Sequence, residues 1–301
     1  MPETRREASD KLTANELATT HPIDLFSGSQ EVRLKLLVDS EVLRRARELE
    51  LPFNGAGIDP FGISRDQVAS TLSVLKFFYR HYFKVLVHQI NHVPPKGRCM
   101  LVGNHSGGYA IDGAMVLASM FFEMSPPRLA QGMAEKFINK SPFVSIWANR
   151  SGQFTGLPEH ALRLLEAERL LLVFPEGSKG TEKLFRERYS LLNFGTGFMR
   201  LALKTRSPIV PFAFLGGGEA VPTISNAKGL GKLLGVPYIP ITPYGLPLPL
   251  PVQLDLYYGE PMYFEGNGNE DDSVIAGYVD QVKSAIANML ENGRRVRKGE
   301  S

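Results

Sequence analysis

The 301-residue chain contains one cysteine and one tryptophan, and its formal net charge is only +3. A single cysteine, Cys99, excludes an intrachain disulfide framework and favours a reducing, cytosolic setting. No Cys/His spacing typical of a zinc site occurs, and the mild charge gives no indication of nucleic-acid binding. We therefore expect a globular protein without a metal or cofactor, in which Cys99 is a small core residue.

A long uninterrupted apolar segment is also missing. The longest charge-free stretch, residues 233–254, contains six prolines, which exclude a continuous helix, so it is predicted to be extended or looped. Residues 1–30 are polar, lack the apolar region of a signal peptide and are predicted to be a disordered lead. Residues 30–51 then show the pattern of an amphipathic helix.

Residues 71–90, TLSVLKFFYRHYFKVLVHQI, are predicted to form a second amphipathic helix. At 100° per residue one narrow stripe is basic and polar, and the rest of the circumference is apolar and aromatic. The stripe consists of Ser73, Lys76, Arg80, Lys84 and His88. Two interpretations remain open: a helix lying in a membrane interface, or a helix held between protein surfaces with a solvated stripe. Residues 31–92 are thus assigned to N-terminal helices.

From residue 93 onward, apolar runs alternate with helical patterns. Runs that begin at residues 99, 170 and 209 are predicted strands, and the predicted helices are 113–122, 158–167 and 194–204. This alternation predicts an α/β domain over residues 93–290, with a mostly parallel central sheet flanked by helices. Residues 216–219 are predicted to be a flexible loop. The basic residues 291–301 are predicted to be a solvated tail, with contact to anionic lipid as the alternative.

Two loops carry the residues suited to chemistry. They lie in VGNHSGGYAIDG (102–113) and VFPEGSKGT (173–181), and each follows an apolar run, so both are expected at the carboxyl edge of the sheet. His105 and Asp112 are a candidate general base and its orienting carboxylate. The alternative is a loop histidine and a helix-capping aspartate. The candidate substrate-binding residues are Asn104, Ser106, Gly107, Glu176, Gly177, Ser178 and Lys179.

Three segments in order, NHSGGYAID (104–112), FPEGSK (174–179) and PIVP (208–211), resemble the motifs of the lysophospholipid (phospholipid/glycerol) acyltransferase superfamily, the glycerolipid acyltransferases. The resemblance spans residues 75–265. Six residues separate His105 from Asp112 where the family usually has four, and Gly107 and Gly108 are expected to permit the bulge. The second motif, 151–160, lacks the usual arginine, with Arg150 just upstream, and Lys179 stands where arginine is commoner.

This resemblance implies transfer of a fatty acyl group without an acyl-enzyme, as in phospholipid biosynthesis. His105 would deprotonate a hydroxyl of a lysophospholipid or other glycerolipid acceptor, which attacks the thioester of acyl-CoA or acyl-carrier protein. Glu176 and Gly177 would shape the acceptor pocket, and Lys179 would meet a phosphate. A peripheral protein on the inner, cytoplasmic face of a membrane is expected. The alternatives are a lipid hydrolase using the same histidine and a non-catalytic lipid-binding protein.

Overall fold

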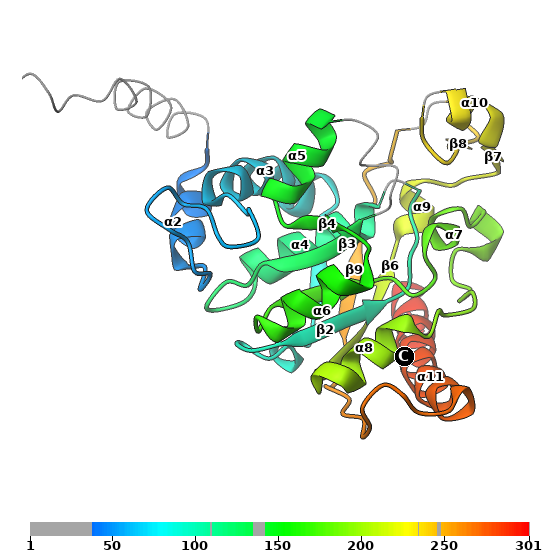
Figure 1. The fold of residues 1–301 in the computed structure, drawn as a ribbon. Coiled ribbons are helices and arrows are strands. Elements are labelled where there is room, and N and C mark those ends of the chain that lie inside the picture. The colour runs from blue at the N-terminus through cyan, green and yellow to red at the C-terminus, as the bar shows by residue number, and fades with distance from the viewer. Residues whose placement is uncertain (1–37, 109, 135–141, 234, 246–247, 301) are drawn as a thin grey trace, which may run out of the picture.

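The computed structural model describes residues 38–108, 110–134, 142–233, 235–245 and 248–300 (Figure 1). In these residues, seven strands form one sheet in the order β1-β9-β6-β2-β5-β3-β4, and β7 pairs with β8. Neighbours in the large sheet run parallel except for β6 and β9. The predicted α/β fold with a mostly parallel sheet is confirmed.

The strands have the following bounds: β1 Leu86–His88, β2 Cys99–Gly103, β3 Ala130–Ala134, β4 Gln153–Thr155, β5 Leu170–Val173, β6 Ile209–Leu215, β7 Ser225–Ala227, β8 Ile239–Ile241 and β9 Asp255–Tyr258. The α-helices are α2 Ser40–Glu48, α3 Arg65–Phe77, α4 Ile111–Phe122, α5 Pro142–Arg150, α6 Pro158–Glu166, α7 Ser178–Thr181, α8 Gly197–Thr205, α9 Gly217–Ala220, α10 Lys228–Leu233 and α11 Asp272–Arg297. A π-helix, Phe78–Tyr82, and two 3-10 turns, Ile90–His92 and Phe185–Glu187, complete the described elements.

Helices cover both faces of the sheet (Figure 1). Along β5 and the residue after it, Leu172 and Phe174 face α4, whereas Leu171 and Val173 face α6 and α8. Such alternation is the normal consequence of the pleat of a strand. Strands β2 and β6 are buried along their whole length, as expected for the centre of a sheet with both faces covered.

The carboxyl ends of three strands meet at one edge and create the place for a site. Val102 of β2 lies opposite Val173 of β5, and Gly103 lies opposite Phe212 of β6. The chain leaves β2 toward His105, leaves β5 toward Glu176 and leaves β6 toward α9. The prediction that both motif loops share the carboxyl edge is therefore confirmed.

The continuous helix predicted over residues 71–90 is wrong. Helix α3 ends at Phe77, the π-helix ends at Tyr82, and Lys84 has a φ of 45° that ends helical geometry. Residues 86–88 then form β1, parallel to β9. The apolar run 85–87 fits a strand as well as a helix, and only the pairing with β9, some 170 residues away in the chain, decides between them.

The basic stripe of that segment is largely occupied by acidic groups of the same chain. Lys76 Nζ lies 2.7 Å from Asp39 Oδ2 and 2.9 Å from Glu41 Oε2. Arg80 pairs with the same Glu41 at 2.8 Å. Asp39 also caps α2, since its carboxylate accepts hydrogen bonds from the amides of Glu41 and Val42. Lys76 therefore holds α2 against α3, and Arg80 holds it against the π-helix.

Other expectations meet mixed outcomes. Helix α6 and strands β2, β5 and β6 lie where predicted, while α8 begins at Gly197 rather than at residue 194. The loop predicted over 216–219 contains helix α9, and the tail predicted over 291–301 is largely the end of α11. Arg297 there contacts Asp255 at 2.5 Å, which ties the helix end to β9. The predictions for residues 1–37 lie outside the described residues.

Candidate active site

His105 and Asp112 form a close pair at the carboxyl edge of the sheet. His105 Nδ1 lies 2.6 Å from Asp112 Oδ2, and the imidazole stacks on Phe174 with ring centroids 4.1 Å apart. The Asp112 side chain is fully buried, whereas the His105 side chain keeps 11% of its surface exposed. In the part of the chain that the structure describes, Nε2 of His105 has no hydrogen-bond partner. A proton on Nδ1 directed at Asp112 leaves Nε2 free to accept one.

Asp112 is fixed from several sides. Its Oδ2 also accepts the amide of Ser106 at 2.7 Å, and its Oδ1 accepts the amide of Gly113 at 2.8 Å. It lies in the first turn of α4, where the helix dipole favours an anion, but Ala110 occupies the cap position. The alternative interpretation of Asp112 as a plain helix cap is therefore wrong.

Glycines form the enlarged loop between the pair. Gly107 has a φ of 97° and Gly108 a φ of 70°, values that other residues rarely adopt. The predicted bulge at these glycines is confirmed. Gly107 also lies against Gly217 of α9, because a Cβ added at Gly107 would lie 3.3 Å from Gly217 Cα. The loop therefore packs on the turn that follows β6.

Glu176 lies beneath the loop and is not exposed to a substrate. Its Oε1 accepts the His105 amide at 2.9 Å, and its Oε2 accepts the Leu192 amide at 2.9 Å. Lys183 Nζ contacts Glu176 Oε2 at 2.5 Å and donates to the His105 carbonyl at 3.2 Å. The Glu176 side chain is 0% exposed and that of Lys183 3%. Glu176 therefore shapes the site by holding the His105 backbone, which corrects its assignment as a substrate contact.

Lys183 is a residue of the candidate site that the sequence analysis missed. A lysine after FPEGSKGTE looks like a surface residue, yet burial lowers the pKa of Lys183 below its ordinary value, with Glu176 and then Asp112 opposing that shift. The pair fixes both the amide and the carbonyl of His105. It therefore sets where the imidazole is placed.

The structure also corrects the prediction that Asn104 binds substrate. Its side chain donates to the Phe214 carbonyl at 2.9 Å and accepts the Phe214 amide at 2.8 Å. Both hydrogen bonds replace missing backbone pairing between β2 and β6 at the point where β2 ends. Since the residue is 1% exposed, it ties the sheet together and does not reach a substrate. Ser106 is likewise buried at 3% and contributes its amide to Asp112.

The other three candidate residues of the FPEG turn are more exposed than Glu176. Lys179 and Gly177 are exposed at the start of α7, and Ser178 is half-buried. Gly177 has a φ of 59°, so the turn needs a glycine there. Gly180 packs directly against the histidine, because an added Cβ would lie 2.5 Å from His105 Cβ. Arg150 at the end of α5 is exposed and is not among the residues around the His105 cavity.

A cavity of about 680 Å³ opens beside His105. It runs between α3, α4 and α5 on one side and strands β3, β4 and β5 on the other. Most of its wall is apolar, and its apolar members include Val74, Leu75, Leu117, Met133, Trp147, Leu172 and Phe174. Val74 is 62% exposed and Trp147 47% exposed, so they mark the outer part of the cavity. Such a volume and lining suit a hydrocarbon chain.

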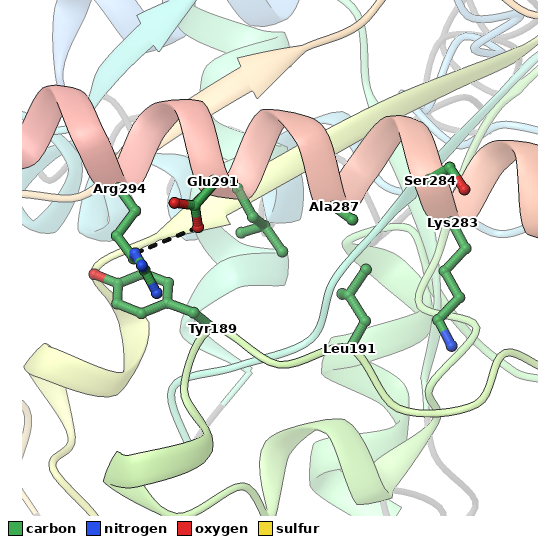
Figure 2. Close-up of a pocket in the computed structure, with 8 residues that line it drawn as sticks. Tyr189, Leu191, Lys283, Ser284, Ala287, Glu291 and Arg294 are labelled. Carbon is green, nitrogen blue, oxygen red and sulfur yellow. Dashed lines mark ion pairs between the residues drawn. The ribbon is translucent and has the colours of Figure 1, made fainter. Parts of the chain in front are cut away.

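A second hollow, of about 300 Å³, lies between the loop at Tyr189 and helix α11 (Figure 2). Its lining mixes polar and apolar side chains, and Arg294 pairs with Glu291 within it. Burial raises the pKa of Tyr189 to about 12, and its hydroxyl donates to Glu219. Neither His105 nor Asp112 lines this hollow. Its loop instead supplies the Leu192 amide that Glu176 accepts, so it supports the site from outside.

Other candidate chemistries find no support in the described part of the chain. No cluster of His, Cys, Asp and Glu there is arranged to hold a metal ion. Cys99 is fully buried in β2, and burial raises the pKa of its thiol to about 12, so it is a core residue as predicted. Among the described helices, none has the length and hydropathy needed to cross a bilayer.

Comparison with known proteins places the chain in a family. A family model described as Acyltransferase matches residues 84–215. An uncharacterized protein of Mycobacterium leprae is 34% identical over 249 residues, covering 79% of this chain and 64% of its own length. An uncharacterized protein of Mycobacterium tuberculosis is 33% identical over 245 residues, covering 77% of this chain and 68% of its own length.

Two further matches have names that state an activity. A Gallus gallus protein named DGAT1/2-independent enzyme synthesizing storage lipids is 25% identical over 176 residues, covering 58% of this chain and 51% of its own length. The crystal structure of the 1-acyl-sn-glycerophosphate acyltransferase PlsC from Thermotoga maritima superposes with a TM-score of 0.53 at 16% identity, covering 90% of this chain and 89% of that chain. The predicted family is confirmed at this level: the chain belongs to the acyltransferase family, and its fold resembles that of PlsC.

Proposed function

We propose that the protein transfers a fatty acyl group from an acyl thioester, acyl-CoA or acyl-carrier protein, to a hydroxyl of a lysophospholipid or other glycerolipid acceptor. The observation that carries the proposal is the His105–Asp112 pair, at 2.6 Å, on the wall of a largely apolar cavity of about 680 Å³. The pair supplies a base, and the cavity supplies room for a hydrocarbon chain.

In this proposal, Nε2 of His105 accepts the proton of the acceptor hydroxyl as its oxygen attacks the thioester carbon. The carbon–sulfur bond then breaks, and the imidazolium returns the proton to the leaving thiolate. Asp112 keeps the Nδ1 proton in place and stabilises the imidazolium charge. A positioned base of this kind is typically worth about 100- to 10,000-fold in rate. No covalent enzyme intermediate is required.

Lys179 is the candidate contact for a phosphate on the donor or the acceptor. It is exposed at the first turn of α7, close in sequence to Gly180, which packs on His105. As a single ammonium it offers charge without the two-pronged geometry of arginine. A modest contribution to binding is therefore expected.

Peripheral association with a membrane belongs to the same proposal, because both lipid substrates partition into bilayers. Apolar side chains are exposed near the outer part of the cavity, among them Val74 at 62%, Phe77 at 54% and Trp147 at 47%. Aromatic side chains of this kind favour the membrane interface. The cytoplasmic, inner-face location stays a prediction from the sequence.

The test is an acyl-transfer assay with labelled long-chain acyl-CoA against a panel of lysolipids and monoacylglycerol in detergent micelles. Wild type and His105→Ala are compared, with melting curves to show that both are folded. An acylated lipid formed by wild type and reduced at least about 100-fold in the variant supports the proposal.

The other outcomes discriminate the alternatives. Thioester consumption without an acylated lipid, persisting when the acceptor is omitted, identifies a hydrolase. Equal activity of wild type and His105→Ala contradicts the mechanism. If acyl-CoA gives no product, the panel is repeated with acyl-carrier protein as donor. Failure with both donors while lipid binding is retained favours the non-catalytic lipid-binding protein.

A further inference from the structure

The segment that follows α9, residues 224–252, has an unusual charge pattern. Residues 224–252 contain two lysines, Lys228 and Lys232, and no acidic residue. The described part of this segment, which comprises β7, α10, β8 and the flanking turns, is named the proline-rich lobe. Its small two-stranded sheet is separate from the central sheet (Figure 1).

The lobe exposes an unusual number of large apolar side chains. Leu233 is 81% exposed, Leu248 62% and Ile224 56%. The other exposed apolar members are Leu230, Ile241, Tyr244 and Leu250. Leu230 and Leu233 are three residues apart on α10 and so lie on neighbouring positions of one face. Large apolar side chains that are exposed together commonly mark a contact surface.

The lobe is attached to the candidate active site. The Tyr238 hydroxyl donates to the Gly108 carbonyl at 3.0 Å, inside the His105–Asp112 loop. The Tyr82 hydroxyl donates to the Pro249 carbonyl at 2.7 Å, which joins the lobe to the π-helix after α3. Asn226 donates to the Glu182 carbonyl at 2.6 Å. The lobe is therefore anchored to the loop that carries His105 and Asp112, at the carboxyl edge of the sheet.

We infer that the proline-rich lobe is a docking surface for an anionic lipid bilayer. The inference rests on the proposed function, because it assigns the surface that brings the site to its lipid substrates. Leucines, two isoleucines and a tyrosine insert among the lipid chains and head groups, and the lobe has no carboxylate to repel anionic lipid. Lys228 is paired with Glu182 at 2.7 Å, so the exposed Lys232 is the cation that attracts anionic head groups.

The test measures binding of the full chain to vesicles by co-sedimentation, with phosphatidylcholine alone and with added phosphatidylglycerol. The lobe variant is Leu230→Asp/Leu233→Asp. The matched control is Tyr263→Asp/Val274→Asp, which replaces two apolar side chains that are 76% and 42% exposed. Tyr263 follows Met262, which pairs with Ile209 at the amino end of β6, so this control lies at the opposite edge of the sheet.

Wild type and the control are expected to bind the anionic vesicles alike, and the lobe variant at least about tenfold more weakly, because two leucines no longer insert. Lys232→Glu should weaken binding to anionic vesicles and leave binding to phosphatidylcholine unchanged. Melting curves confirm that all variants are folded.

The inference is overturned if wild type does not bind vesicles, if the lobe variant binds like wild type, or if the control loses as much. The inference is also overturned if the lobe variant loses binding to acyl-carrier protein but still binds vesicles, because the lobe would then be a surface for an acidic protein partner. Vesicle binding needs no turnover. Lobe-dependent binding without acyl transfer would therefore support the inference and refute the proposed function.

Discussion

Two buried ion pairs flank strand β5, one at each end. Arg169, just before the strand, places Nη2 2.9 Å from Asp59 Oδ2, and Glu176, just after it, contacts Lys183 Nζ at 2.5 Å. None of the four side chains is more than 4% exposed. The first pair fixes the turn before α3, since Asp59 also accepts the amides of Phe61 and Ile63.

The same interaction thus has different consequences at the two ends. The Asp59–Arg169 pair stabilises a turn at the amino edge, whereas the Glu176–Lys183 pair grips the amide and carbonyl of His105. Removing one partner of a buried pair typically costs about 3–5 kcal/mol of stability, because the other charge stays buried. The comparison predicts similar losses of stability and dissimilar losses of activity.

The largest effect on activity is expected for Asp112→Asn, compared with Asp59→Asn at the other edge. Without the Asp112 charge the imidazolium is unsupported and the Nδ1 proton is no longer fixed, so kcat should fall at least about 100-fold. Asp59→Asn should lower the melting temperature and leave kcat near that of wild type. A similar fall in kcat for both variants would show that general loosening, and not the His–Asp pair, controls the rate.

Lys183→Met and Arg169→Met sharpen the comparison directly. Denaturant titration should show that each loses about 3–5 kcal/mol of unfolding free energy. Below their melting temperatures, Lys183→Met should lose about tenfold or more in kcat with little change in KM, since a misplaced base harms the reaction more than binding. Arg169→Met should keep both constants. If kcat and KM are unchanged in Lys183→Met, Lys183 contributes to stability and not to the placement of His105.

Gly180→Ala tests the placement of His105 without removing any charge. The new Cβ would lie 2.5 Å from His105 Cβ, so the histidine must move, and we expect about a tenfold loss of kcat. Gly197→Ala in α8 is the control, because nothing lies within 4 Å of its added Cβ. It should retain activity and gain slightly in stability. Equal activity of the two variants would show that the site tolerates displacement of the histidine.

The two pairs should also respond differently to alkaline pH. Burial holds the pKa of Lys183 below 10.5, so it loses its proton at a lower pH than the unfolded chain does. Between the pKa of Lys183 in the folded protein and its pKa in the unfolded chain, the unfolded state binds more protons. The contribution of Lys183 to stability therefore rises with pH in this range. Activity falls in the same range, because the Glu176–Lys183 ion pair is lost. The arginine of the other pair keeps its charge. Lys183→Arg should shift the alkaline loss of activity upward; an unshifted profile would assign it to another group.

The smallest effect is expected for Lys179→Ala, since Lys179 is exposed and takes part in neither pair. With one acyl donor, KM for a phosphate-bearing acceptor should rise by roughly threefold, as for a solvent-screened charge contact, and KM for monoacylglycerol should stay unchanged. Equal changes for both acceptors would deny Lys179 a contact with the acceptor's phosphate.

The sequence alone identified the family, the strands β2, β5 and β6, and the His105–Asp112 pair. These are local properties: an apolar run of four or five residues ends in glycine or proline, and two glycines within six residues permit the bulge. Helix α11 could also have been predicted from the sequence. Its buried residues Ile275, Val279, Val282, Ile286 and Leu290 recur every three or four positions, which is the spacing of an amphipathic helix.

Tertiary structure decided the rest. Whether 86–88 was helix or strand depended on β9, and whether Asn104 met a substrate or the backbone depended on Phe214, 110 residues away. Glu176 reaches the His105 amide across 71 residues, and Lys183 reaches its carbonyl across 78. Chain-local patterns report propensity and periodicity, but the burial and pairing of a charge depend on which distant segments the sheet brings together. The sequence therefore determined the candidate catalytic pair, and the fold determined which residues hold that pair in place.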